Sequence, residues 1–137
     1  MKTATLMQHT ITGLAEKFEV DLTQPGAALQ LELDGFMPLS LECIGPSQVA
    51  VCHFFMQEGD LMADPEIVFF TGYKEWVPVE ITQAPLGVWR RYAELCADAS
   101  AISKLNPSGV AELADFANQW ARNLREQGWL KAGRRRA

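Results

Sequence analysis

Histidine and cysteine are scarce in this sequence, and several patterns that carry enzymatic chemistry are missing from it. The chain has two histidines, His9 and His53, and three cysteines without CxxC spacing. It contains no GxSxG, no Gly-rich phosphate loop and no HExxH. Neither a disulfide framework nor a zinc site is therefore indicated. We expect Cys43, Cys52 and Cys96 to be small buried hydrophobic residues.

Long hydrophobic runs are also missing. The longest apolar stretches, such as VAVCHFFM, stop well short of the ~18 residues that a membrane helix needs. The N-terminal segment MKTATLMQHTITGLAEKF has no continuous apolar region and no clear small-residue cleavage site of the kind found in signal peptides. We therefore expect a cytoplasmic protein that does not span a membrane.

The composition is that of a folded protein. Hydrophobic residues make up 48% and charged residues 21% of the 137 residues, which is too apolar for intrinsic disorder. The length fits one domain. We predict a single domain over residues 1–130, followed by a flexible basic tail over residues 131–137, KAGRRRA.

The net charge of -5 conceals an uneven distribution of charge along the chain. Residues 1–80 carry 12 acidic and 3 basic side chains, whereas residues 81–137 carry 5 acidic and 9 basic ones. This separation favours an acidic face and a basic end, and so an interaction with charged partners. The alternative is solvated charge that serves only solubility.

The spacing of apolar residues predicts a helix, a group of strands, and two further helices. Apolar residues recur at near-helical spacing in the first segment, alternate in the middle, and return to helical spacing after Gly87. The predicted helices are residues 3–18, 88–103 and 109–127, and the predicted strands are residues 29–33, 37–43, 48–56, 66–70 and 76–82.

These elements predict an α+β fold, because the strands are grouped together and so are the helices. We expect an antiparallel sheet of four to five strands over about residues 28–82, flanked by an N-terminal helix and two C-terminal helices packed on one face. The strand at residues 48–56 is apolar on both sides, so it should be central. Pro78 places the last strand at an edge or at a bulge.

The stretch from His53 to Glu66, HFFMQEGDLMADPE, is the best candidate for chemistry. A histidine and carboxylates brought together by a hairpin can hold a divalent metal or form an acid/base pair. The spacing matches no known metal-ligand motif, and the loop does not supply an EF-hand. The candidate functional cluster is His53, Gln57, Asp60, Asp64 and Glu66. We expect no cofactor, the alternative being a divalent metal, and assign no residue as a metal ligand.

The alternative interpretation of this stretch is structural. Glycine and proline form turns, aspartates bond to nearby backbone amides, and a histidine on an apolar strand face is commonly a core residue. Cys52 and His53 should point to opposite faces of their strand, which argues against a cysteine nucleophile.

The aromatic residues offer a second kind of site. Tyr73 and Trp76 lie at a predicted hairpin end beside the acidic stretch, where they are candidates for contact with a partner. Trp89 and Trp120 fall on predicted helix stripes and are expected in the core. The terminal arginines are a weak signal for nucleic acid in a chain of pI ≈ 5.0, so a nucleic-acid partner is not expected.

The stretch HFFMQEGDLMADPEIVF resembles a bacterial domain family of unknown function, whose motif reads H-[YF]-[YF]-x-Q-N-G-D-L-M-x-D-P-E-[MI]. The resemblance extends to GFMPLSLE, WVPVEITQAPLG and FANQWARNLREQGWL, about three quarters of the chain. Glu58 departs from it, since the family usually shows asparagine there. The resemblance implies an origin on plasmids and integrative elements, implies no catalytic activity, and suggests by association a role related to anti-restriction or host defence.

Two functions follow from these observations. The first is a non-enzymatic accessory domain of mobile-element origin that binds a protein partner through an acidic surface around residues 58–66, with Tyr73 and Trp76. The second is a small metal-dependent or acid/base enzyme centred on His53, Asp60, Asp64 and Glu66. The enzyme requires those four groups to meet in one cleft.

Overall fold

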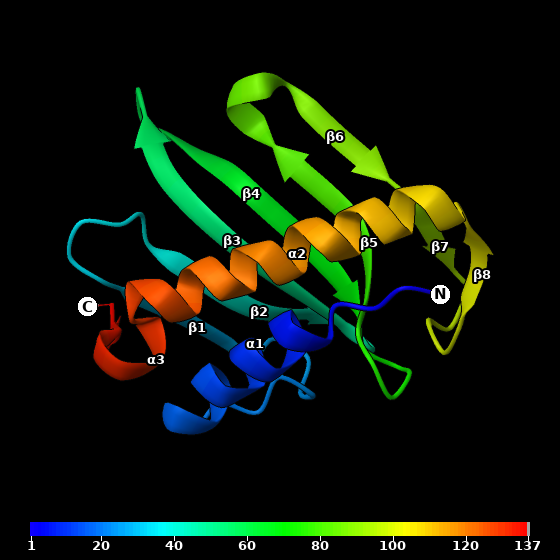
Figure 1. Ribbon diagram of the computed structural model, residues 1–137, viewed down its shortest axis with the longest axis horizontal. Helices are drawn as coiled ribbons and strands as arrows, with labels where there is room; N and C mark the ends of the chain where they lie inside the picture. Colours follow the sequence, from blue (N-terminus) through cyan, green and yellow to red (C-terminus); the bar gives the residue numbers. More distant parts are fainter. Residues whose placement is uncertain (137) are drawn as a thin grey trace.

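The computed structural model describes residues 1–136, which form a sheet, two main helices and a small hairpin (Figure 1). The helical elements are α1 (Thr5–Lys17), the 3-10 helix η1 (Ala84–Leu86), α2 (Pro107–Gln127) and α3 (Trp129–Ala132). The strands are β1 (Ala28–Glu32), β2 (Leu39–Gly45), β3 (Gln48–Gln57), β4 (Asp60–Phe70), β5 (Val77–Gln83), β6 (Val88–Arg91), β7 (Ala93–Leu95), β8 (Ile102–Leu105) and β9 (Arg134–Arg135).

The main sheet has seven antiparallel strands in the order β6-β5-β4-β3-β2-β1-β9. The α+β class and the central position of β3 are confirmed. The prediction of four to five strands is wrong, because β6 adds to one edge and β9 to the other. Val68 of β4 pairs with Glu80 and the next residue, Phe69, pairs with Pro78, so Val79 is an extra residue in β5. The strand that contains Pro78 therefore has a bulge, which is one of the two predicted alternatives.

The prediction of a helix over residues 88–103 is also wrong. Gly87 adopts a left-handed conformation (φ 65°) that turns the chain back, and β6 then pairs with β5, while β7 and β8 form a separate hairpin. In β6 the Arg91 guanidinium bonds to Glu80 of β5 at 3.0 Å. Backbone pairing with an existing strand thus outweighs the helical spacing of the apolar residues. As a result Trp89, expected in the core, is 53% exposed.

Helices α1 and α2 cover one face of the sheet (Figure 1). Their apolar sides pack against every second residue of the strands to form the main core. This packing explains why apolar and polar residues alternate along several strands. Fully buried members of this core include Met7, Ile11, Leu14, Leu31, Leu41, Val51, Ile67, Leu124 and Trp129. Among residues 1–136, no helix has the length and apolar character that a membrane span needs.

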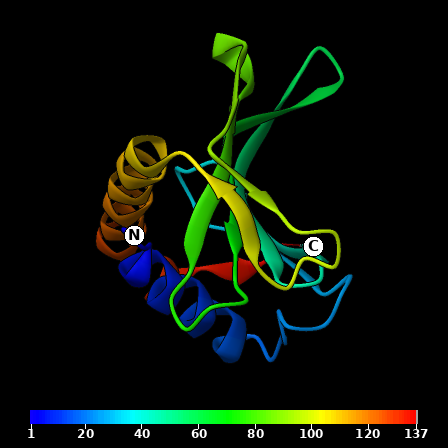
Figure 2. The same ribbon diagram turned by 90° about the vertical axis from the view of Figure 1, so that its right-hand side faces the viewer.

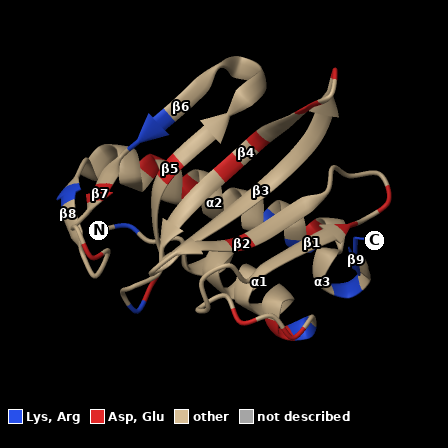
Figure 3. Ribbon diagram, turned by 180° about the vertical axis from the view of Figure 1, so that it is seen from behind, with Lys and Arg blue, Asp and Glu red and all other residues tan. Residues whose placement is uncertain are grey.

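The opposite face of the sheet is covered only at one end, by the β7–β8 hairpin (Figure 2). A second, smaller cluster of buried residues lies there, formed by Ala50, Val68, Phe70, Val77, Val79, Ala93 and Val110. Over the rest of this face no helix of residues 1–136 lies on the strands (Figure 3). We call this uncovered part the open face.

Helix α2 begins and ends as its sequence predicts. The Asn106 side chain accepts a hydrogen bond from the Gly109 N–H at 3.1 Å, and Pro107 occupies the first turn. Gly128 ends the helix in a left-handed conformation with φ 94°. Of the two predicted C-terminal helices, the one over residues 109–127 therefore forms, as α2, and the four-residue α3 that follows it was not predicted.

The basic segment at residues 131–137, expected as a flexible tail, is structured where it is described. Lys131 belongs to α3, and Arg134–Arg135 form β9 against β1. The Arg134 guanidinium contacts Asp34 at 3.0 Å, so the basic end of the chain meets acidic groups of its first half. Ala137 lies outside the described residues.

Candidate functional site

A bulge in β4 determines how the acidic stretch is arranged. Cys52 pairs with Glu66 and Phe54 pairs with Ala63, so two residues of β4, Asp64 and Pro65, lie opposite the single residue His53. The peptide bond between those two residues is cis. A bulge of this kind redirects side chains that simple alternation would place elsewhere. Here it brings both Asp64 and Pro65 to the helix side of the sheet.

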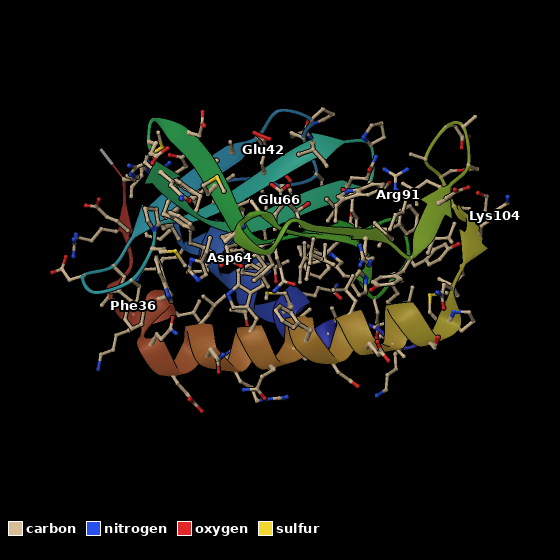
Figure 4. The ribbon with its side chains drawn as sticks, turned by 90° about the horizontal axis from the view of Figure 1, so that it is seen from above. Phe36, Glu42, Asp64, Glu66, Arg91 and Lys104 are labelled. Atoms are coloured by element: carbon tan, nitrogen blue, oxygen red, sulfur yellow. The ribbon has the colours of Figure 1, made fainter. Side chains whose placement is uncertain are left out.

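On the helix side, His53 and Asp64 line one groove of about 310 Å³ between the sheet and α2. Its other walls are Met37, Pro65, Phe116, Gln119, Trp120, Asn123 and Gln127. We call this the helix-side groove. Figure 4 shows Asp64 in the region between the strands and α2. Asp64 is the only Asp, Glu, Lys or Arg among the described residues that line the groove.

His53 is held as a neutral ring in this groove. Its side chain is 8% exposed, and its Nδ1 lies 3.2 Å from the carbonyl oxygen of Pro38. A carbonyl only accepts, so Nδ1 carries the proton and Nε2 is left as an acceptor. Burial lowers the pKa of His53, against opposing effects of the Pro38 and Met37 carbonyls and of Asp64. The ring therefore stays neutral at physiological pH.

Trp120 of α2 forms the inner wall of the groove. Its ring lies 5.4 Å from the His53 ring, measured between centroids, and it is 7% exposed. Its indole Nε1–H is buried and has no hydrogen-bond partner among residues 1–136. A buried donor without an acceptor is costly, which makes this atom unusual.

Glu66 lies on the open face, away from His53. Its neighbours there are Glu80 of β5 and Glu42 of β2. Figure 4 shows Glu42 and Glu66 on the side of the strands away from α2. Burial raises the pKa of Glu66, and Glu80 and Glu42 raise it further. Cys52 also lies on the open face. Burial raises the pKa of its thiol to about 12, with further contributions from the charges of Glu66 and Asp64. The thiol therefore stays protonated and is a poor nucleophile.

Gln57 and Asp60 lie at the end of the β3–β4 hairpin, where they pair across the turn. Both are exposed. Between them Glu58 (φ 51°) and Gly59 (φ 86°) have the left-handed conformations of a tight hairpin turn. The predicted cluster is therefore distributed over three places: the helix-side groove, the open face and the hairpin end. Among residues 1–136, no three His, Cys, Asp or Glu side chains are grouped to hold a metal ion.

Tyr73 and Trp76, the two aromatic residues predicted to contact a partner, differ in how far they are buried. Trp76 is 6% exposed and stacks on Phe69 in the main core. Tyr73 is 39% exposed, stacks edge-on against Phe70, and its hydroxyl accepts from the Ile102 N–H at 3.1 Å. Tyr73 thus attaches the β7–β8 hairpin to the sheet.

Sequence reasoning missed several residues of both faces. Glu42 and Glu80 occupy polar positions of alternating strands, and their proximity to Glu66 required the strand order. Trp120 was recognised as a core residue, but its missing hydrogen-bond partner has no signal in the sequence. The groove amides Gln119 and Asn123 lie four residues apart on α2 and bond to each other at 3.1 Å.

Comparison with protein families identifies one match. Residues 9–130 match the model of a "Domain of unknown function (DUF6908)". The chain belongs to this family. The matched region of this DUF6908 domain runs from α1 to α3 and includes the whole acidic stretch. No curated protein and no solved structure matched the chain.

Proposed function

We propose that this DUF6908 domain is a non-enzymatic interaction module that binds a positively charged segment of a protein partner across its open face. The observation that carries the proposal is the group of three carboxylates, Glu42, Glu66 and Glu80, on adjacent parts of a sheet face that no helix of residues 1–136 covers. Burial raises the pKa of Glu66, and repulsion from Glu80 and Glu42 raises it further; a basic partner would relieve this repulsion.

Exposed apolar side chains at the strand ends add to this support. Met56 and Leu61 on the β3–β4 hairpin are each 60% exposed, Leu86 at the β5–β6 turn is 69% exposed, and Trp89 is 53% exposed. Apolar and aromatic anchors around a charged surface are typical of protein-binding sites. The partner segment is therefore expected to combine lysine or arginine with apolar residues.

One salt bridge already crosses this face. The Nε and Nη2 atoms of Arg91 both contact one oxygen of Glu80, at 3.2 and 3.0 Å. Arg91 is a model of the interaction that a partner arginine would make with Glu66 and Glu42. We further propose that the natural partner is a basic protein that handles DNA, in keeping with the mobile-element origin and the anti-restriction association that the family resemblance implies.

The alternative function, a metal-dependent or acid/base enzyme centred on His53, Asp60, Asp64 and Glu66, has less support. It requires the four side chains to meet, and only His53 and Asp64 share a groove. The location expected for the protein is the cytoplasm, where a DNA-handling partner would be found.

The test is a titration of the ¹⁵N-labelled protein with a synthetic peptide that alternates arginine and leucine, followed by NMR. We expect shifts at residues around Glu42, Glu66 and Glu80, and an affinity that falls steeply between about 50 and 300 mM salt. The triple variant Glu42→Gln/Glu66→Gln/Glu80→Gln should bind at least tenfold more weakly. Asp64→Asn, a matched change on the other side of the sheet, should bind as the unchanged protein does.

Binding that is insensitive to salt, or shifts confined to the helix side of the sheet, would rule out the acidic open face as the binding surface. A peptide that alternates glutamate and leucine serves as the charge control. If it binds as well as the basic peptide, the apolar anchors alone are responsible and the electrostatic proposal fails.

A further inference from the structure

We propose that the partner segment bound by the open face is an amphipathic α-helix that crosses the strands, with basic residues at helix positions i, i+4 and i+11. This inference rests on the proposed function, because it names the conformation and the charge pattern of the segment that the same carboxylates bind. The face extends from β1 to β6, five strand spacings or about 24 Å, which a helix of about 16 residues spans.

Strand register places the three carboxylates in a fixed order across the open face. Ala50 of β3 pairs with Glu42 of β2 and with Val68 of β4, and Val68 pairs with Glu80 of β5. Paired residues of neighbouring strands project to the same face. Glu66 lies two positions before Val68 in β4, so it shares this face and stands beside the line from Glu42 to Glu80. Acidic positions on β2, β4 and β5 are visible together from this side (Figure 3).

The distances between the carboxylates follow from the strand spacing. Neighbouring strands lie about 4.8 Å apart, so in the direction across the strands Glu66 is about 5 Å from Glu80 and about 10 Å from Glu42. An α-helix advances about 6 Å over four residues and about 10 Å over seven. Helix positions i, i+4 and i+11 also lie within about 40° of one another around the helix axis. Basic side chains at these positions therefore reach Glu80, Glu66 and Glu42 in turn.

A segment that lies on the open face meets side chains and finds no backbone partners there. The backbone N–H and C=O groups of β3, β4 and β5 bond to neighbouring strands within the sheet. A segment that loses contact with water on this face must satisfy its own backbone groups, and a helix does so internally. Helices α1 and α2 cover the other face of the same sheet in this way (Figure 1).

The shape of the face determines the direction of the helix axis. The β7–β8 hairpin covers the face at one end of the strands, so a helix aligned with the strands would meet it (Figure 2). Across the strands, the middle of the face carries the short side chains of Ala50 and Cys52 on β3. A leucine at helix position i+7, about 10 Å from position i, lies above these two residues, where their short side chains leave space for it.

A hollow at the edge of the hairpin offers a second apolar contact. Ile44, Val68 and Glu80 line this hollow of about 350 Å³ together with residues of the hairpin. Ile44 is 46% exposed, although it is a large apolar residue. Helix position i+3 is turned about 60° from position i toward one side of the helix, and a leucine there reaches the hollow beside Glu80.

Arginines limit the acidic part of the face at both ends. Arg91 of β6 bonds to Glu80 at 3.0 Å, and Arg136 lies 3.5 Å from the side chain of Gln30 on β1. The basic residues of the partner are therefore confined to about 15 Å, the three strand spacings between β2 and β5. Arg135 and Arg136 make the β9 end of the sheet basic, so the negative C-terminal end of the helix dipole should lie there. A second copy of this chain does not fit, because its open face would bring carboxylates against carboxylates.

The experiment compares three peptides of about 16 residues, each added to the intact protein. The first is an alanine-rich helix with lysine at i, i+4 and i+11 and leucine at i+3 and i+7. The second has the same composition with lysine at i, i+2 and i+9, which places the charges on different sides of the helix. The third keeps the first pattern but replaces two central alanines by proline, which prevents the helix. We expect the first peptide to bind at least tenfold more tightly than the others and to gain helical circular dichroism on binding.

Charge exchange tests the register. Replacement of the peptide lysine at i+11 by glutamate should weaken binding to the unchanged protein about tenfold, and Glu42→Lys in the protein should restore it. Glu112→Lys is the matched control, because it makes the same change at an exposed position of α2, on the other side of the sheet. It should leave the binding of the glutamate peptide weak.

Failure of this inference is distinguishable from failure of the proposed function. If the peptide of alternating arginine and leucine binds the open face and the helical peptide binds no more tightly, the helix is overturned while the proposed function stands. If neither peptide binds in a salt-dependent way, the proposed function fails and the helix fails with it. Equal binding of the two lysine arrangements, or rescue by Glu112→Lys, overturns the spacing. The dispersion of the amide spectrum of each variant shows whether it is folded, so loss of structure is distinguished from loss of binding.

Discussion

Asp64 and Glu66 stand two positions apart in β4, yet their carboxylates lie on opposite faces of the sheet. In a regular strand such a pair would share a face. The bulge opposite His53 adds one residue to β4, and this extra residue moves Asp64 to the helix side while Glu66 remains on the open face. One acidic stretch thereby contributes to two different surfaces.

Replacement of Glu66 by glutamine is expected to stabilise the protein at neutral pH. The folded state raises the pKa of Glu66, so the folded protein resists ionisation of this group more than the unfolded chain does. The free energy of unfolding is therefore highest below the ordinary pKa of 4.5 and decreases as the pH rises from 4.5 through the raised pKa of the folded state. Glu66→Gln keeps the shape without the charge. The melting temperature of the variant should exceed that of the parent at pH 7, and the difference should shrink toward pH 4.

The control for this prediction is Glu94→Gln, at an exposed position of β7. It should leave the melting temperature within about a degree at both pH values, as surface substitutions commonly do. A lower melting temperature for Glu66→Gln at pH 7 would contradict the assignment of Glu66 to a desolvated, repulsive environment.

Acidification is expected to destabilise the protein through His53. Burial lowers the pKa of this histidine in the folded state, so the unfolded chain binds a proton more readily as the pH falls below about 6.5. The free energy of unfolding in urea should therefore decrease between pH 7.5 and 5.5. His53→Gln should remove this decrease.

His9 provides the matched control, because it is the other histidine and its side chain is exposed on α1. His9→Gln should keep the loss of stability on acidification. If His9→Gln removes the pH dependence and His53→Gln retains it, the buried neutral state of His53 is wrong.

Replacement of Glu58 by asparagine is expected to stabilise the β3–β4 hairpin. Glu58 has φ 51°, a left-handed conformation that is unfavourable for glutamate and better tolerated by asparagine, the residue of the resembled motif. We expect a gain of roughly 0.5–1 kcal/mol in the free energy of unfolding. Urea titration measures it.

Gly59 tests the same turn in the opposite direction. Its φ of 86° is strained for any side chain, so Gly59→Ala should destabilise the protein although nothing lies within 4 Å of the added methyl group. A neutral Gly59→Ala together with a destabilising Glu58→Asn would contradict the turn geometry.

Gly109 and Gly13 form a pair of helix glycines with opposite predictions. A Cβ at Gly109 would clash with the ring of Tyr92 at Cδ1, so Gly109→Ala should cost about 1–3 kcal/mol in the free energy of unfolding. A Cβ at Gly13 would meet Cδ2 of Leu130 at 3.4 Å, an ordinary contact. Gly13→Ala should stabilise α1 by about 0.5–1 kcal/mol. Equal effects of the two changes, measured by thermal unfolding, would contradict the close packing of Tyr92 against α2.

Part of the fold follows from local pattern. Residues that alternate with period two became β1, β2 and β5, and the run that is apolar on both sides became β3. The capping residues Asn106 and Gly128 fixed both ends of α2, because these signals depend on neighbours in sequence. The helix predicted over residues 88–103 failed because β6 forms by pairing with β5, and a pairing partner that is distant in space has no local signal.

In the candidate site, too, some features follow from the local sequence and others only from the pairing of strands. The sequence by itself determined that Cys52 and His53 lie on opposite faces of a central strand, that Gly59 forms a turn, and that carboxylates are in excess in the first half of the chain. Only the tertiary structure decided that Asp64 accompanies His53 while Glu66 joins Glu42 and Glu80. The reason is that strand register and a one-residue bulge arise from pairing between strands, whereas alternation arises within one strand.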